Sequence, residues 1–260
     1  MRAIPLVAVL VLPLALTACK SPVDSLVTGS ISREVPVQSA TTQEGWNAIA
    51  DKWRPSYEKD PGNAAAGLNY GRALRALGQR SQALAVLQTS TIKNPGNMAL
   101  LGEYGRALAD NGRFQEALDV FERAHTPDKP NWRILTAQGA VLDQMGRGAE
   151  AIRYHQTALK YAPGDPGVLS NMGLSYALQN DLVSAERSLR EAYASPKADM
   201  RVRLNLALVL SLQGKFKDAE TIARQDLSAE QAAQNTATLR AMLSQSNNWQ
   251  KLRQMDGKTG

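Results

Sequence analysis

Few side chains in this chain of 260 residues can act as nucleophiles or metal ligands. The single thiol belongs to Cys19, and the two imidazoles belong to His125 and His155. Neither histidine has a Glu or Cys at the spacing of a zinc site, and one cysteine cannot form an intramolecular disulfide. The Gly-x-Ser-x-Gly, His-Glu-x-x-His, phosphate-loop and dinucleotide-binding patterns are missing as well. These observations predict a protein that is not an enzyme and that needs no metal, cofactor or small-molecule substrate.

The cysteine stands at the end of an N-terminal segment with the features of a secretory signal. Met1–Arg2 is a short basic start, and residues 3–16 form an apolar stretch that two prolines interrupt. That stretch is too short to span a bilayer as a helix. Small residues directly before Cys19 complete a cleavage site. We therefore expect residues 1–18 to be a signal peptide that is removed from the mature protein.

The four residues Leu16-Thr17-Ala18-Cys19 resemble the lipobox of bacterial lipoproteins. In that family the cysteine thiol takes a diacylglyceryl group, the signal is cut before the cysteine, and the new amino group is acylated. The resemblance implies a lipidated Cys19, because several acyl chains anchor a protein stably to a membrane. Lys20 follows where an aspartate would resemble the inner-membrane retention signal, so the resemblance implies the outer membrane, with the domain facing the periplasm. The alternative is an ordinary signal peptide that contains an incidental cysteine.

Two segments follow the cleavage site. Residues 19–42 are rich in Ser, Thr, Val and Pro without helical periodicity, and they predict a flexible tether. Residues 43–60 predict a leading helix, because four apolar side chains recur at helical spacing: Trp46, Ile49, Trp53 and Tyr57. Pro55 falls within this segment, so the helix is expected either to kink or to end near Trp53.

Three ladders of small or turn-forming residues recur through the middle of the chain every 34 residues. The first ladder is Gly71, Gly105, Gly139, Gly173 and Ala207. The second is Ala83, Ala117, Ala151, Ala185 and Ala219, and the third is Gly78, Gly112, Gly146, Asn180 and Gly214. A glycine inside a helix costs about 1 kcal/mol relative to alanine, so we expect two helices to pack closely at the first ladder. Because alanine fills its last place, we also expect alanine at the glycine positions to be tolerated.

This fixed step indicates an all-α solenoid of helix–turn–helix units. The pattern is similar to the tetratricopeptide repeat, whose signature is W-x₂-L-G-x₂-Y, then A-x₃-F, then P. The resemblance covers residues 64–228 and implies about five units, each with a helix A, a turn at the third ladder and a helix B: 64–97, 98–131, 132–165, 166–199 and 200–228. The last unit lacks the closing proline, so its helix B is expected to run on or to bend differently.

The C-terminal region predicts a capping helix over residues 229–255. Ser228 and Gln231 have the spacing of a capping box, which marks a helix start. Apolar residues at helical spacing continue to about Ser244, and this helix is expected to cover the exposed end of the last unit.

The charge of the chain permits an anionic partner but does not point to nucleic acid. The formal net charge is +6, yet Lys and Arg are spread through the chain with no run of four or more. That distribution is typical of a solvated mixed-charge surface. We therefore predict a protein or peptide partner and no nucleic-acid partner.

The tetratricopeptide resemblance also implies a binding face. In that family the A helices line a concave groove, mainly through their second, fifth, sixth, ninth, twelfth and thirteenth residues. Carried onto this sequence, those positions give seven polar groove candidates: Asn69, Arg72, Arg106, Arg133, Asn171, Arg201 and Asn205. Asparagine amides can pair with the backbone of an extended peptide, and guanidinium groups suit carboxylates. We expect Arg72 and Arg106 to project side by side into solvent, the alternative being that they only pair with Glu103 or Asp110.

The whole organisation resembles the TadD-type lipoproteins of tight-adherence (Flp) pilus assembly and the type IV pilus pilotins. In those families a lipoprotein helps a secretin or pilus component reach or assemble in the outer membrane. The resemblance implies a non-enzymatic, lipid-anchored scaffold whose partner is a secretin or pilus-assembly component. The alternative is a periplasmic adaptor that recruits cell-wall or other envelope-biogenesis enzymes.

Overall fold

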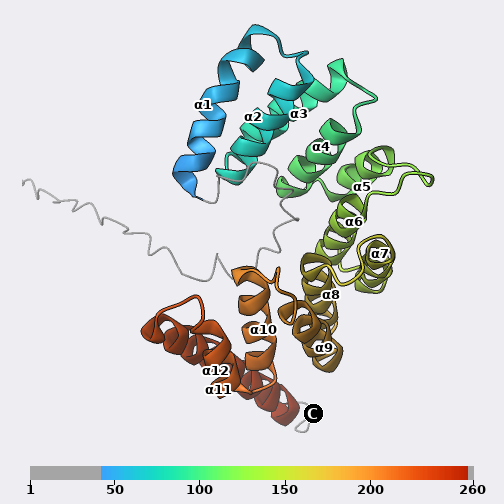
Figure 1. Ribbon diagram of the computed structural model, residues 1–260. Coiled ribbons are helices and arrows are strands. Elements are labelled where there is room, and N and C mark those ends of the chain that lie inside the picture. The colour runs from blue at the N-terminus through green and yellow to red at the C-terminus, as the bar shows by residue number, and fades with distance from the viewer. Residues whose placement is uncertain (1–41, 257–260) are drawn as a thin grey trace, which may run out of the picture.

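The computed structural model describes residues 42–256, so Cys19, the signal peptide and the tether up to residue 41 lie outside the described residues. The described chain is helical, and an isolated antiparallel bridge joins Thr126 to Lys129. Its helices follow one another along an arc (Figure 1). Their bounds are α1 Gln43–Lys59, α2 Ala64–Ala76, α3 Arg80–Lys93, α4 Met98–Asp110, α5 Phe114–Arg123, α6 Trp132–Gln144, α7 Gly148–Tyr161, α8 Pro166–Leu178, α9 Leu182–Tyr193, α10 Met200–Leu212, α11 Phe216–Ala223 and α12 Ala229–Asp256.

Ten of these helices pair into five successive units, which we number 1 to 5: α2–α3, α4–α5, α6–α7, α8–α9 and α10–α11. The first helix of each unit is its A helix and the second its B helix. The leading helix α1 packs on α2, and α12 packs on α10 and α11. The predicted fold class, an all-α solenoid with a leading helix and a C-terminal capping helix, is confirmed.

Every A helix begins at a side chain that caps it. An Asn or Asp stands before each A helix at the same repeat position, and its side-chain oxygen accepts a hydrogen bond from a backbone N–H of the first turn: Asn63, Asn97, Asn131, Asp165 and Asp199. Such caps satisfy N–H groups that the helix itself leaves without a partner. This capping ladder is visible in the sequence but was not among the three ladders from which the repeats were predicted.

Each A helix ends at the turn predicted by the third ladder. All five residues of that ladder have positive φ, with values from 62° at Asn180 to 78° at Gly214. Glycine and asparagine adopt this left-handed conformation most readily, and it ends a helix so that the chain can reverse direction.

The first ladder marks the contact between the two helices of a unit. A Cβ atom built on Gly105 would lie 2.6 Å from Cε1 of the buried Phe121, and the other three glycines of the ladder meet a side chain of helix B at similar distances. Helix A therefore presses its backbone directly against a large side chain of helix B. The expectation that alanine would be tolerated at Gly105 is wrong, because the ring of Phe121 occupies the space that a methyl group needs. Ala207 fits in unit 5 because the corresponding helix B residue there is Ala223.

The two ends of the solenoid differ in detail from the sequence-based expectations. Helix α1 continues through Pro55 to Lys59, so it does not end near Trp53. Helix B of the last unit, α11, does not run on, because it is short and ends at Ala223. Ser228 and Gln231 form the expected reciprocal capping box, with hydrogen bonds of 3.2 Å and 3.0 Å. The helix that they open runs to Asp256, close to the expected bound at residue 255 and beyond the apolar periodicity that continues to about Ser244.

The arc curves toward the A helices. Each A helix contacts the next one along the chain, whereas within residues 42–256 no B helix of a unit contacts the B helix of the next unit. Because successive A helices lie closer together, they line the inner side of the arc (Figure 1). We call this inner surface, formed by α2, α4, α6, α8 and α10, the concave face. Among the described residues, no helix is both long enough and apolar enough to cross a membrane.

Candidate functional site: the concave face

The N-terminal half of the concave face holds a network of ion pairs centred on Glu103. This carboxylate accepts contacts from three guanidinium groups on α2 and α4: Arg72 at 3.1 Å, Arg75 at 2.8 Å and Arg106 at 3.1 Å. Arg75 also binds Asp110 at 2.7 Å. The network therefore joins units 1 and 2 and contains three cationic groups and two carboxylates.

The network shifts the protonation of its central carboxylate. Burial by itself raises the pKa of Glu103, but the charges of Arg106, Arg75 and Arg72 outweigh it and lower the pKa to about 2. Desolvation likewise opposes the charged form of Arg75, and the carboxylates of Glu103 and Asp110 nevertheless raise its pKa. Glu103 and Arg75 are thus both ionised near neutral pH, and their ion pair holds each in a fixed position.

The structure corrects the expectation for Arg72 and Arg106. Arg106 is buried, with 3% of its surface exposed, and the side chain of Arg72 is 18% exposed. They do not project freely into solvent, because Glu103 lies between them and binds both. The structure shows instead that both pair with Glu103, which was the alternative. Of the two, Arg72 is the one that reaches the surface of the concave face.

The remaining groove candidates fall into two groups. Arg133 and Arg201 lie partly exposed near the start of their A helices; the guanidinium of Arg133 stacks over Trp132 at 4.4 Å, and that of Arg201 lies 3.5 Å from Asp199. The three asparagines at the sixth position do not act alike. Asn69 donates to a carbonyl of its own helix, and Asn171 is buried. Asn205 donates to the hydroxyl of Ser170 at 3.0 Å, so its amide belongs to the packing between α10 and α8.

A buried Ser, His and Asp lie together where units 3 and 4 meet. Ser175 donates its hydroxyl hydrogen bond to Asp143, and Nε2 of His155 lies 3.7 Å from the same carboxylate. His155 is fully buried in the place that Phe121 takes in unit 2. The serine faces the aspartate rather than the histidine, so the histidine is not placed to activate it as a nucleophile. Within the described part of the chain, no group of three or more His, Cys, Asp or Glu residues could hold a metal ion.

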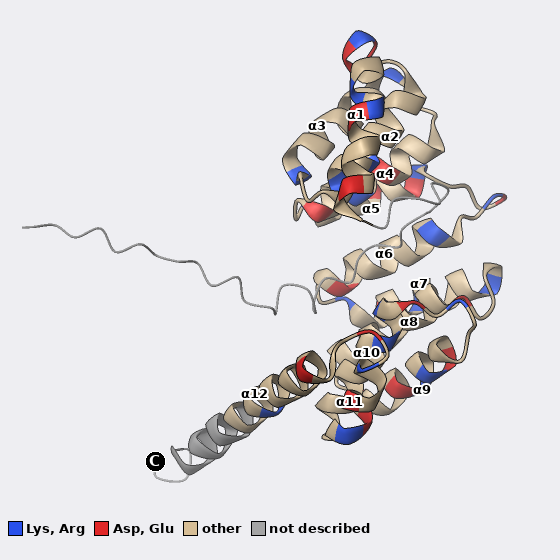
Figure 2. Ribbon diagram, turned by 60° about the vertical axis from the view of Figure 1, so that its left-hand side comes forward, with Lys and Arg blue, Asp and Glu red and all other residues tan. Residues whose placement is uncertain are grey.

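The C-terminal half of the concave face has a different chemistry that the sequence reasoning did not single out. Helix α8 contains no charged residue, and α10 carries its two arginines near its start. Figure 2 shows charged residues on α4. The signal was present in the sequence, since the ninth and thirteenth positions of both helices are leucine: Leu174, Leu178, Leu208 and Leu212.

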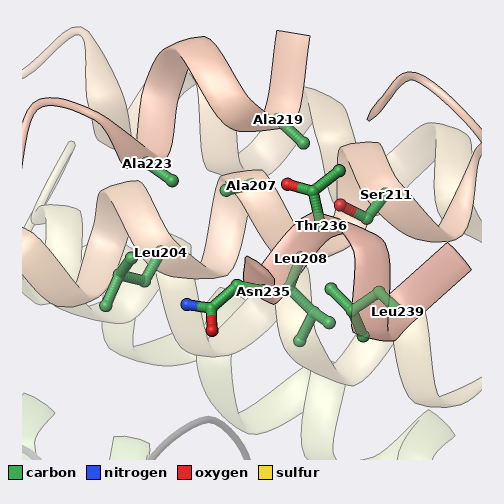
Figure 3. A pocket seen from close by; sticks show the side chains of 9 residues that line it. All are labelled: Leu204, Ala207, Leu208, Ser211, Ala219, Ala223, Asn235, Thr236 and Leu239. Carbon is green, nitrogen blue, oxygen red and sulfur yellow. The ribbon is translucent and has the colours of Figure 1, made fainter. Parts of the chain in front are cut away.

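Helix α12 closes the end of this apolar region. Leu204 and Leu208 of α10 line a small cavity together with Leu239 and Thr236 of α12 (Figure 3). Ala219 and Ala223 of α11 complete one wall. The capping helix therefore shields one side of the leucine-rich surface and leaves the side toward α8 uncovered.

Comparisons with known proteins agree with this geometry. A tetratricopeptide repeat model matches residues 57–131 and 136–199, and a second one matches residues 200–225. None of the curated proteins compared with the chain matches it significantly.

Solved structures share the architecture at low identity. A thermophilic tetratricopeptide protein of Thermus thermophilus is 22% identical, with a TM-score of 0.57 over 70% of this chain and 97% of that one. The human IFIT1 dimer with m7Gppp-AAAA is 16% identical, with a TM-score of 0.62 over 80% of this chain and 52% of that one. A chain of the APC/C hetero-tetramer Cut9-Hcn1 is 16% identical, with a TM-score of 0.61 over 79% of this chain and 40% of that one. At such identities the likeness concerns the fold alone. With family models matching more than half of the chain and the five units observed, the chain belongs to the tetratricopeptide repeat family.

Proposed function

We propose that this chain is a non-enzymatic protein-binding scaffold. The observation that carries the proposal is the continuous concave face of five A helices, because helical solenoids use such extended inner surfaces to bind partners. The face also joins a fixed charged network to an uncovered apolar surface. Such a combination suits a polypeptide segment better than a small molecule, which favours an enclosed pocket.

We further propose that lipid on Cys19 anchors the protein to the outer membrane, with the repeats facing the periplasm. The support is the Leu16-Thr17-Ala18-Cys19 motif behind a basic and apolar leader. A leader followed by a lipidated cysteine, a tether and a repeat domain is the organisation of the TadD-type lipoproteins. On this basis the scaffold assists assembly of an Flp-type pilus or its secretin.

Replacing the thiol tests the anchor. Cys19→Ser is expected to leave the precursor uncut or to release the product from the membrane, since acyl chains supply about 0.8 kcal/mol per buried methylene group. Fractionation of cells followed by immunoblotting measures the distribution, and Ser21→Ala, outside the four-residue motif, serves as the matched control. A Cys19→Ser protein that stays in the outer-membrane pellet at the wild-type level would rule out this anchor.

Affinity purification tests the partner. The tagged chain is extracted from membranes in mild detergent, and bound proteins are identified by mass spectrometry. Enrichment of a secretin or of pilus-assembly components supports the proposed role. Enrichment of peptidoglycan synthases or hydrolases instead supports the envelope-adaptor alternative, and the absence of any enriched protein contradicts the scaffold itself.

A further inference from the structure

Equivalent repeat positions on the concave face change chemistry from one end of the arc to the other. The ninth residue of the A helix is arginine in units 1 and 2, alanine in unit 3 and leucine in units 4 and 5: Arg72, Arg106, Ala140, Leu174 and Leu208. The thirteenth residue passes from Ala76 and Asp110 through Gln144 to Leu178 and Leu212. Since equivalent positions face the same way in a solenoid, the concave face has a charged half and an apolar half.

The apolar half is a patch of four leucines on two neighbouring helices. Leu174 and Leu178 lie one turn apart on α8, Leu208 and Leu212 lie one turn apart on α10, and the two helices are in contact. Leu178 is 68% exposed, and the other three are half-buried. A single exposed leucine is ordinary, but Leu174, Leu178 and Leu212 lie on adjacent helices beside Leu208, which borders α12, and such a group forms a surface of the kind that binds a partner.

The charged half presents arginine side chains that can bind carboxylates. Its ion pairs hold three guanidinium groups together on α2 and α4. The side chains of Arg72 and Arg75 remain partly exposed, and the buried Glu103 holds both in position. Guanidinium groups fixed in this way bind a carboxylate without first losing side-chain freedom.

We propose that the concave face binds an extended segment of a partner protein that carries acidic side chains at one end and aliphatic side chains at the other. The acidic end lies against α2 and α4, and the aliphatic end lies on the leucine patch of α8 and α10. This inference rests on the proposed scaffold function and specifies the chemistry of its partner. Five A helices at about 10 Å spacing cover about 40 Å, which an extended chain of about twelve residues spans.

Synthetic peptides on the full-length chain in detergent test the proposal. The probe is a fluorescein-labelled peptide of about twelve residues, with glutamates at one end and leucines at the other, made in both directions. One comparison peptide has lysines in place of the glutamates, and another has serines in place of the leucines. Fluorescence anisotropy is expected to show that one direction of the Glu/Leu peptide binds at least about tenfold more tightly than either comparison peptide, with an affinity that falls as salt rises.

Variants of the chain assign the two ends of the peptide. Leu178→Ser should weaken binding of the Glu/Leu peptide about tenfold, because a leucine contact is lost. Val183→Ser is the matched control: Val183 is 70% exposed, close to the exposure of Leu178, but lies on the B helix α9. Arg72→Gln should weaken binding of the Glu/Leu peptide about fivefold and reduce the salt dependence of its affinity. Circular dichroism melts of the same variants confirm that each is folded.

Several results would overturn the inference. These are equal binding of the lysine and glutamate peptides, no measurable binding of either Glu/Leu peptide, or equal losses for Leu178→Ser and Val183→Ser. A dimer that Leu178→Ser dissociates would show instead that a second copy of the chain covers the patch. If affinity purification still yields a partner while the peptides show no preference, the scaffold function stands and this assignment fails.

Discussion

At the scale of single residues, Glu103 is central to the charged network, because it pairs with all three arginines. Its pKa of about 2, against 4.5 for an ordinary glutamate, means that the folded state favours the ionised form. A carboxyl group whose pKa is lowered by folding stabilises the protein above its unfolded pKa, and this stabilisation is lost as the pH falls through the folded value. The contribution is therefore complete above about pH 5 and disappears between about pH 4.5 and pH 2.

Glu103→Gln should destabilise the protein at neutral pH by about 3 kcal/mol, because it leaves three guanidinium groups around a neutral amide. The difference from wild type should shrink as the pH falls below about 4.5. Denaturant melts at a series of pH values measure it. Glu116→Gln is the control, since Glu116 pairs with Arg113 in solvent and contributes little. A loss of stability that stays constant with pH would contradict the role of the charged carboxylate.

The buried imidazole of His155 offers a second residue-scale prediction. Within the described structure neither of its ring nitrogens has a hydrogen-bond partner, and unit 2 places Phe121 at the same position. His155→Phe should therefore raise the free energy of unfolding by about 1 kcal/mol, because a buried polar group without a partner is removed. The reverse change, Phe121→His, should lower it. Chemical denaturation compares the two, and a stabilised Phe121→His variant would contradict this view of the position.

Sequence reasoning was strongest for positions that repeat and weakest for contacts between units. The three ladders predicted the helix pairing and the turns, because each of their residues acts within its own unit through backbone geometry or close packing. The pairing of Arg72, Arg75 and Arg106 with one carboxylate depends on the distance between α2 and α4 and on side-chain conformation. Neither is visible in a spacing of 34 residues, so the exposure of Arg72 and Arg106 was predicted wrongly.

At the scale of helices, the contact between helix A and helix B follows a rule of paired sizes. Where helix A carries glycine, helix B carries a large side chain 16 residues later, as Phe121 follows Gly105, and where helix A carries Ala207, helix B carries Ala223. The first ladder predicted close packing of the two helices. It did not predict the size of the helix B side chain at the contact, because that residue does not belong to the ladder.

Gly105→Ala should therefore cost about 1–3 kcal/mol through overpacking against Phe121. Gly105→Leu should cost more. In the background of Phe121→Ala, Gly105→Ala should cost almost nothing, since the added methyl group then fills part of a cavity. A double-mutant cycle measured by thermal and denaturant melts isolates this coupling. Additive effects of the two substitutions would show that the ladder is not a packing contact.

At the scale of the whole molecule, the solenoid is held together by contacts between neighbours. Each unit touches only the units beside it, and α12 touches only α10 and α11 within residues 42–256. Stability in such a chain is the sum of the stabilities of its units and of their interfaces, so damage at one end should remain local.

Removal of residues 229–260 should destabilise unit 5, because the apolar surface of α10 and α11 under Ala232 and Leu239 is then exposed. Amide hydrogen exchange should show lost protection in α10 and α11, while α2 to α5 keep theirs. Removal of residues 246–260 alone serves as the control and should leave α10 protected. An equal loss of protection in all five units would mean that the solenoid unfolds as one cooperative body.

The most direct test of the central claim, that this is a scaffold which binds a protein segment on its concave face, is photo-crosslinking in the producing cell. A photoreactive amino acid replaces Leu178 on the concave face in one strain and Val183 on α9 in another. We predict that position 178, and not position 183, forms adducts, and that mass spectrometry maps them to one segment of one partner protein with acidic and aliphatic side chains. Adducts from position 183 alone, or none from position 178 while the protein is folded and at its normal level, would contradict the claim.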